Sequence, residues 1–121
     1  MAQKKTVVLG ASDNPSRYSY LAVRKLAAHH HPVVAVGRKP GTVAGIGIET
    51  SPVAAEDVDT VTLYLNPANQ VPYYDYILGL RPKRIIFNPG TENDELIQKA
   101  KEQGIEPFMG CTLVMLSTGQ Y

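Results

Sequence analysis

The sequence has a single cysteine, no tryptophan and no clear excess of charge of either sign. Because Cys111 has no second cysteine to pair with, an internal disulfide is excluded, which agrees with a reducing compartment. The formal net charge is +1, and basic and acidic residues are interspersed, so no general attraction to nucleic acid or to an anionic membrane is expected. Any anion site must therefore be local.

Long hydrophobic runs are also missing. No apolar stretch approaches the roughly 18 residues of a membrane-spanning helix, and the N-terminal segment "MAQKKTVVLGAS" has too short an apolar run for a secretion signal. We therefore expect a cytoplasmic protein. The 121 residues, 44% hydrophobic and 19% charged, suit one domain with one core, which we expect to span residues 1–121.

Short β-like runs alternate with longer helix-like segments along the chain. Strands are expected at residues 6–9, 32–36, 60–65 and 84–88, with a weaker fifth at 106–109. Several of these runs are apolar at consecutive positions, which is typical of strands covered by helices on both faces. The alternation predicts an α/β protein with a three-layer, Rossmann-like fold and a central, mostly parallel, five-stranded sheet.

Helices are expected between these strands. After the first strand, one buried helical face recurs at three- and four-residue steps: Ser19, Ala22, Val23, Leu26 and Ala27. A second helix is expected from the cap Asn66 to about residue 79. A third is expected from the cap Thr91 to the terminator Gly104, and a short terminal helix from the cap Thr112.

The turn after the first strand has the chemistry of a phosphate site. A strand that ends in glycine and leads into a helix is where doubly wound proteins place a phosphate group, and Gly10 lets the backbone approach it closely. Ser12, Asn14 and Ser19 add polar side chains. Arg17 adds a permanent, bidentate cation beside the free amides of the helix start.

The dinucleotide fingerprint G-x-G-x-x-G is absent, because Ser12 and Pro15 stand where its second and third glycines would follow Gly10. At the end of the second strand, NAD enzymes commonly place an acid that holds the ribose hydroxyls. This chain instead has a basic segment there: Gly37, Arg38 and Lys39. Cations at this position indicate a ribose that carries a phosphate, which both NADP and coenzyme A possess.

A run of three histidines and the single cysteine raise the question of a metal site or a catalytic residue, but the pattern of residues around them supports neither. His29, His30 and His31 are consecutive, and neighbouring helical residues diverge by about 100°, so the three side chains cannot converge on one metal ion. We expect a cluster at a helix end and no metal site. Cys111 follows the fifth strand and precedes a helix, where a thiol is reactive, but no base is visible nearby. A buried structural cysteine is favoured, and no catalytic residue is assigned.

Three segments together resemble the CoA-binding domain family. They are "VLGAS-x-x-P-x-R-x-S" after the first strand, "VVAVGRKPGTVAGIGI" as the second strand and its basic loop, and "FNPGTEN" after the fourth strand. Members of this family are small stand-alone Rossmann proteins similar to the N-terminal domain of the succinyl-CoA synthetase alpha subunit. The resemblance covers nearly the whole chain and implies that coenzyme A or an acyl-CoA lies across the carboxyl ends of the strands.

The resemblance also implies which segment of the chain would contact each part of coenzyme A. The pyrophosphate would be held by the first loop, which contains Gly10, Ala11, Ser12, Asn14, Pro15, Arg17 and Ser19. The adenosine and its phosphate would face Gly37, Arg38 and Lys39. The crevice further along would be lined by Asn66, Pro67, Pro89 and Gly90. Stand-alone members generally have no established reaction, so ligand binding without catalysis is expected.

Several alternatives stay open. The basic loop also allows an NADP-binding oxidoreductase or NADP sensor, and Cys111 allows either an enzyme acting on a CoA thioester or a mixed disulfide with coenzyme A. A partner protein without nucleotide affinity is a further alternative. Tyr64, Tyr73, Tyr74 and Tyr76 suit adenine stacking, core packing or the surface of a homodimer.

Overall fold

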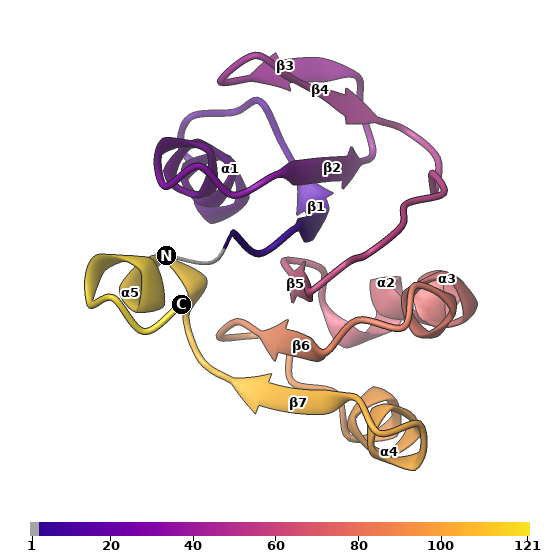
Figure 1. Cartoon of the computed structure of the whole chain (residues 1–121). Coiled ribbons are helices and arrows are strands. Elements are labelled where there is room, and N and C mark those ends of the chain that lie inside the picture. The colour runs from indigo at the N-terminus through magenta and orange to yellow at the C-terminus, as the bar shows by residue number, and fades with distance from the viewer. Residues whose placement is uncertain (1–2) are drawn as a thin grey trace.

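Seven strands form one sheet in the computed structural model, which describes residues 3–121 (Figure 1). The strands are β1 (Thr6–Ala11), β2 (Val33–Gly37), β3 (Gly41–Val43), β4 (Ile46–Glu49), β5 (Thr60–Leu63), β6 (Arg84–Phe87) and β7 (Glu106–Met109). Their order across the sheet is β3-β4-β2-β1-β5-β6-β7, and all neighbouring strands are parallel except β3 and β4. The predicted α/β class and mostly parallel sheet are confirmed.

The predicted number of five strands is wrong, because part of the segment interpreted as a basic loop after the second strand forms a hairpin. β3 and β4 pair antiparallel and are joined by Ala44 and Gly45, whose φ angles are 53° and 78°. Positive φ at both central residues is typical of a tight hairpin turn, which usually has Asn or Asp first. Alanine at the first position, together with Gly41 and Gly47 in the strands, concealed the hairpin pattern.

Helices cover both faces of the sheet (Figure 1). One face carries α1 (Tyr18–Ala28) and α5 (Thr112–Ser117). The other carries α2 (Pro67–Gln70), the 3-10 helix η1 (Val71–Tyr73), α3 (Tyr74–Gly79) and α4 (Asp94–Glu102). Because alternate residues of a strand face opposite sides, Val7 and Leu9 of β1 belong to one buried cluster and Val8 belongs to the other. The result is a three-layer fold of Rossmann type.

The first two predicted helices are partly confirmed. α1 buries the expected Ser19, Ala22, Val23 and Leu26, whereas Ala27, also expected on this face, is only partly buried. Asn66 caps α2 as predicted, since its side chain accepts a hydrogen bond from the Asn69 amide at 2.9 Å. The helix does not run unbroken to residue 79, because Pro72 lacks an amide hydrogen and the chain divides into α2, η1 and α3.

Two predicted caps are wrong by one or two residues. Asn93, and not Thr91, caps α4, since its side chain accepts from the Leu96 amide at 3.2 Å. The Thr91 hydroxyl instead donates to the Asn88 carbonyl at 2.7 Å. Cys111 occupies the cap position of α5, while Thr112 is the first helical residue. Among the helices within residues 3–121, none has both the length and the apolar character needed to cross a membrane.

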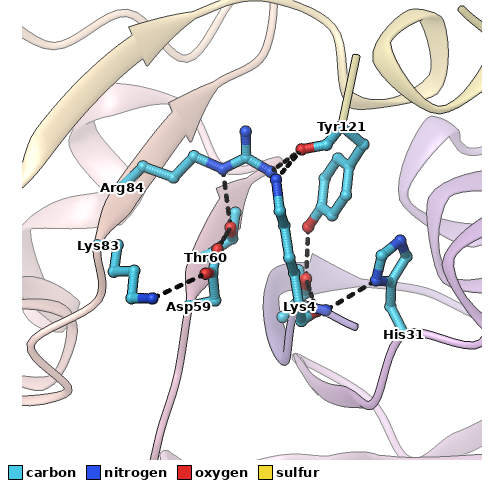
Figure 2. Close-up of polar contacts among 8 residues, drawn as sticks. Lys4, His31, Asp59, Thr60, Lys83, Arg84 and Tyr121 are labelled. Atoms are coloured by element: carbon cyan, nitrogen blue, oxygen red, sulfur yellow. Dashed lines mark hydrogen bonds and ion pairs between the residues drawn. The ribbon is translucent and has the colours of Figure 1, made fainter. Parts of the chain in front are cut away.

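A polar cluster closes the amino-terminal end of the sheet (Figure 2). Arg84, the first residue of β6, donates from Nε to the Thr60 hydroxyl at 2.8 Å and from Nη2 to the main-chain oxygen of Tyr121 at 2.9 Å. The Tyr121 hydroxyl hydrogen-bonds with the Thr6 hydroxyl, and its ring centroid lies 4.5 Å from the Arg84 guanidinium carbon. Tyr121 therefore attaches the segment after α5 to the first residues of β1 and β6, and through Arg84 to the first residue of β5.

We expect Tyr121→Ala to lower the free energy of unfolding by about 2 kcal/mol, because it removes the ring that Arg84 and His31 contact. The matched control is Tyr18→Ala, since Tyr18 is 72% exposed and should change stability by about 0.5 kcal/mol or less. Urea denaturation of the two variants measures the difference. Equal effects would show that the cluster contributes nothing specific.

His31 gives this cluster a pH dependence. Its Nδ1 accepts a hydrogen bond from the Lys4 amide at 2.9 Å, and burial, with the nearby His29, Lys4 and Arg84, lowers the pKa of His31 below its ordinary 6.5. Below pH 6.5 the unfolded chain therefore takes up the proton more readily than the folded chain does. Folding stability should fall as the pH drops through this range.

Replacing His31 with Gln should flatten the dependence of stability on pH below 6.5, as measured by urea denaturation at a series of pH values. His30→Asn is the control, because His30 has a φ of 65° that asparagine tolerates. An unchanged pH profile in the His31 variant would contradict the assignment.

Candidate functional site

A cleft of about 910 Å³ opens at the carboxyl ends of β1, β2, β5 and β6, a volume within the range of small-molecule sites. β1 lies between β2 and β5, so the segments after β1 and β5 diverge here, at the usual ligand position of an open α/β sheet. The described residues that line the cleft are Gly10, Ala11, Ser12, Asp13, Asn14, Arg17, Tyr18, Ser19, Arg38, Lys39, Tyr64, Leu65, Asn66, Asn69, Pro89, Gly90 and Thr91.

Close backbone contacts form the floor of the cleft. The register of β1 with β2 shifts between Leu9 and Ala11, and Gly10 lies in this bulge with a φ of 92°. A β-carbon at Gly37 would lie 2.2 Å from the Ala11 carbonyl oxygen, far inside van der Waals contact. Gly37 therefore allows the backbones of β1 and β2 to meet, while Gly10 allows β1 to approach the backbone of Tyr64 directly after β5.

The loop between β1 and α1 is held by its own side chains. The Ser12 hydroxyl oxygen accepts from the Asn14 amide at 3.0 Å, and Asn14 Oδ1 accepts from the Ser16 amide at 3.0 Å and its hydroxyl at 2.8 Å. Among residues 3–121, neither the Ser12 hydroxyl hydrogen nor the Asn14 side-chain amide group donates to a protein acceptor, so both remain available to a ligand. Arg17 occupies the cap position of α1 without a side-chain cap, so the first helical amides also face the loop.

One half of the cleft is cationic. Arg17, Arg38 and Lys39 are exposed, and the one side-chain ion pair within residues 3–121 joins Lys83 and Asp59, which precede β6 and β5 at the other end of the sheet. Asp13 is the one carboxylate among the described lining residues, and a β-carbon at Gly41 would lie 2.7 Å from its Oδ2. Its carboxylate therefore lies over the start of β3, while the three cations remain uncommitted.

The other half, formed by residues 64–69 after β5 and 89–91 after β6, has no charged side chain among its described lining residues. We call it the neutral half. Within it, the Asn66 side-chain oxygen is occupied by the Asn69 amide, and the Gly90 amide donates to Glu92 Oε1 at 2.9 Å. This half offers mostly main-chain atoms and uncharged side chains to a ligand.

The structure brings most of the sequence-predicted site residues together around this cleft. Three predicted residues do not line it: Pro15 is exposed in the loop, Gly37 is buried behind Ala11, and Pro67 is the first residue of α2. The lining residues that sequence reasoning did not assign are Asp13, Tyr18, Tyr64, Leu65, Asn69 and Thr91. Tyr64, considered only for adenine stacking or packing, and Leu65 were not assigned to the site, because both were placed in the strand expected at residues 60–65. The observed strand, β5, ends at Leu63.

The other residues considered at the sequence level lie elsewhere. Cys111 is only partly buried, against the expectation of a buried cysteine, and it does not line the cleft. His29, His30 and His31 follow α1, and no group of metal-binding side chains assembles among residues 3–121. Tyr73, Tyr74 and Tyr76 pack against the core on the α3 side of the sheet.

Tyr64 differs from Tyr73, Tyr74 and Tyr76, because it lies directly after β5 and is among the residues that line the cleft. Its hydroxyl is buried and has no hydrogen-bond partner in the described part of the chain. Burial raises the pKa of Tyr64 well above its usual value, so the side chain stays neutral in ordinary buffers. The Tyr64 side chain packs against the apolar cluster that α1 and α5 cover, so its buried hydroxyl is not offered to a ligand.

We expect Gly37→Ala to lower the free energy of unfolding by about 1–3 kcal/mol, because the added methyl group would push β1 and β2 apart at the cleft floor. Gly47→Ala is the matched control, since nothing lies within 4 Å of the added carbon and the substitution should be close to neutral. Thermal or urea unfolding compares the two. Similar costs would mean that the backbones can separate freely at Gly37.

The chain is similar to several proteins of known structure. A crystal structure of an uncharacterized protein matches with a TM-score of 0.96 and 55% identity, covering 100% of both chains. A hypothetical protein from Pyrococcus horikoshii OT3 and a protein from Thermus thermophilus both match with a TM-score of 0.86 and 24% identity, which shows the same fold. The matches cover 96% and 98% of this chain and 83% and 91% of those two chains, respectively.

No curated protein matches the chain at the level of significance that these similar structures reach. The sequence profile of the CoA binding domain matches residues 4–117, which is almost the entire chain. The chain therefore belongs to the CoA binding domain family.

Proposed function

We propose that the protein binds coenzyme A or an acyl-CoA in the cleft. The observation that carries this proposal is the division of the cleft into a cationic half beside β1 and β2 and a neutral half beside β5 and β6. Coenzyme A is divided in the same way, because its phosphates are all on the adenosine side and its pantetheine arm is uncharged. Membership of the CoA binding domain family supports the same ligand class.

The pyrophosphate suits the loop between β1 and α1. Gly10 brings the backbone close, while the Ser12 hydroxyl and the first amides of α1 supply donors to a phosphate. Arg17 adds a guanidinium that can bind phosphate oxygens in a bidentate manner. Since the loop is already fixed by Ser12 and Asn14, little ordering is needed when a ligand binds.

The 3′-phosphate suits Arg38 and Lys39, which follow β2 at the outer side of the cationic half. Neither has a carboxylate partner within residues 3–121, so a phosphate would not have to displace an existing ion pair. We assign no reaction to the site. Cys111 lies outside the cleft lining, and the described lining residues include no histidine or cysteine to serve as base or nucleophile.

Calorimetric titration with coenzyme A, dephospho-CoA and NADP tests the ligand class. We expect saturable binding of coenzyme A, about 10- to 100-fold weaker binding of dephospho-CoA through loss of charge-assisted contacts, and little binding of NADP. Saturable binding of NADP without coenzyme A would overturn the proposal in favour of an NADP protein. Absence of heat for all three ligands would leave the cleft without a nucleotide.

Two variants test separately the cations after β2 and the cation at the start of α1. Arg38→Ala combined with Lys39→Ala should remove most of the difference between coenzyme A and dephospho-CoA, whereas Arg17→Ala should weaken both ligands about tenfold. The control is Lys99→Ala combined with Lys101→Ala, which removes two cations from the last turn of α4. Equal weakening in the control would show that the cations act only through net charge.

A further inference from the structure

Gln70, the last residue of α2, has a completely buried side chain. Its Nε2 donates to the main-chain oxygens of Leu65 and Thr91, both at 2.8 Å, and its Oε1 accepts from Asn93 Nδ2 at 2.9 Å. Both amide hydrogens are therefore used. Full burial of a glutamine is uncommon and is costly unless such bonds are made, so this side chain is committed to its partners.

The partners of Gln70 belong to the two walls of the neutral half. Leu65 lies in the segment after β5, and Thr91 lies in the segment after β6; both line the cleft, whereas Gln70 does not. Asn93 caps α4 through the Leu96 amide and also donates to the Tyr74 hydroxyl at 2.8 Å. A single carboxamide thus joins both walls and the start of α4.

We propose that Gln70 is a positioning residue that fixes the separation of the two walls, and that the neutral half holds the pantetheine arm. This inference rests on the proposed function. Hydrogen bonds to an uncharged arm require donors and acceptors within a few tenths of an ångström, so a wall that shifts loses them. The cationic half lies beside β1 and β2, and within residues 3–121 the Gln70 carboxamide hydrogen-bonds to Leu65, Thr91 and Asn93, none of which belongs to that half.

The ratio of affinities for coenzyme A and adenosine 3′,5′-bisphosphate isolates the neutral half, because the second ligand has no pantetheine arm. We expect wild-type protein to bind coenzyme A more tightly. Gln70→Met keeps the length of the side chain but removes both donors, and it should lower the ratio about tenfold with the bisphosphate affinity unchanged. The control is Tyr121→Ala, which alters the opposite end of the sheet and should leave the ratio unchanged.

Each outcome separates the inference from the proposed function. Failure of wild-type protein to bind either ligand would overturn the proposed function. If wild-type protein binds both ligands with equal affinity, or if Gln70→Met weakens both ligands equally, the inference is overturned and the proposed function still stands. If Gln70→Met does not fold, Asn93→Ser replaces it, because serine keeps the cap of α4 and removes the donor to Gln70. Its ratio should also fall, and an unchanged ratio would reject the inference.

Discussion

At Gly10 the backbone of β1 leaves its register with β2, and the shape of the carboxyl end of the sheet follows from this bulge. Leu9 still pairs with Val36 and with Leu63 of β5, but Ala11, two residues later, lies opposite Gly37, which directly follows Val36. The Ala11 carbonyl then covers Gly37 so closely that no side chain fits between them. β2 ends at this contact, and the next residues, Arg38 and Lys39, line the cleft.

The two ends of the sheet differ in whether Arg84, Lys83 and the cleft cations have partners within the protein. At the amino-terminal end, the Arg84 guanidinium bonds to Thr60 and Tyr121, and Lys83 pairs with Asp59 at 3.9 Å. At the carboxyl end, cations line the cleft without an ion-pair partner in the described chain. Exposed cations stay hydrated at little cost, so the cleft can hold them ready for an anion, whereas buried polar groups need partners within the fold.

Local chemistry explains which features could be predicted from the sequence. Asn66 followed by Pro67 predicted the start of α2, because a cap and a proline act within one helical turn. The hairpin of β3 and β4 was missed, because Ala44 adopts a positive φ that alanine rarely does. Thr91 was a reasonable cap, but its hydroxyl bonds to the Asn88 carbonyl, a contact set by how the loop folds back after β6.

Gln70 could not be assigned from the sequence. A glutamine in a short helix is normally exposed, and its burial depends on two carbonyls, those of Leu65 and Thr91, which are brought together only when β5 and β6 pair. The predicted site residues, by contrast, belong to short continuous segments after single strands. Sequence patterns therefore located the segments that line the cleft, while the groups that hold those segments together depended on tertiary contacts.

The buried carboxamides of Gln70, Asn88 and Asn93 lie beneath the half of the cleft where the proposed contacts are short-range hydrogen bonds and not long-range charge attraction. Coulomb attraction between a cation and a phosphate falls slowly with distance, so Arg38 and Lys39 can attract a phosphate from exposed side chains. Contacts to an uncharged arm decay within a few tenths of an ångström. Beneath the segments after β5 and β6, Gln70, Asn88 and Asn93 are all buried and bonded, and Asn88 alone joins Leu63, Thr62 and the first amide of α5. Buried, hydrogen-bonded carboxamides thus hold the segments where we propose that the uncharged arm binds.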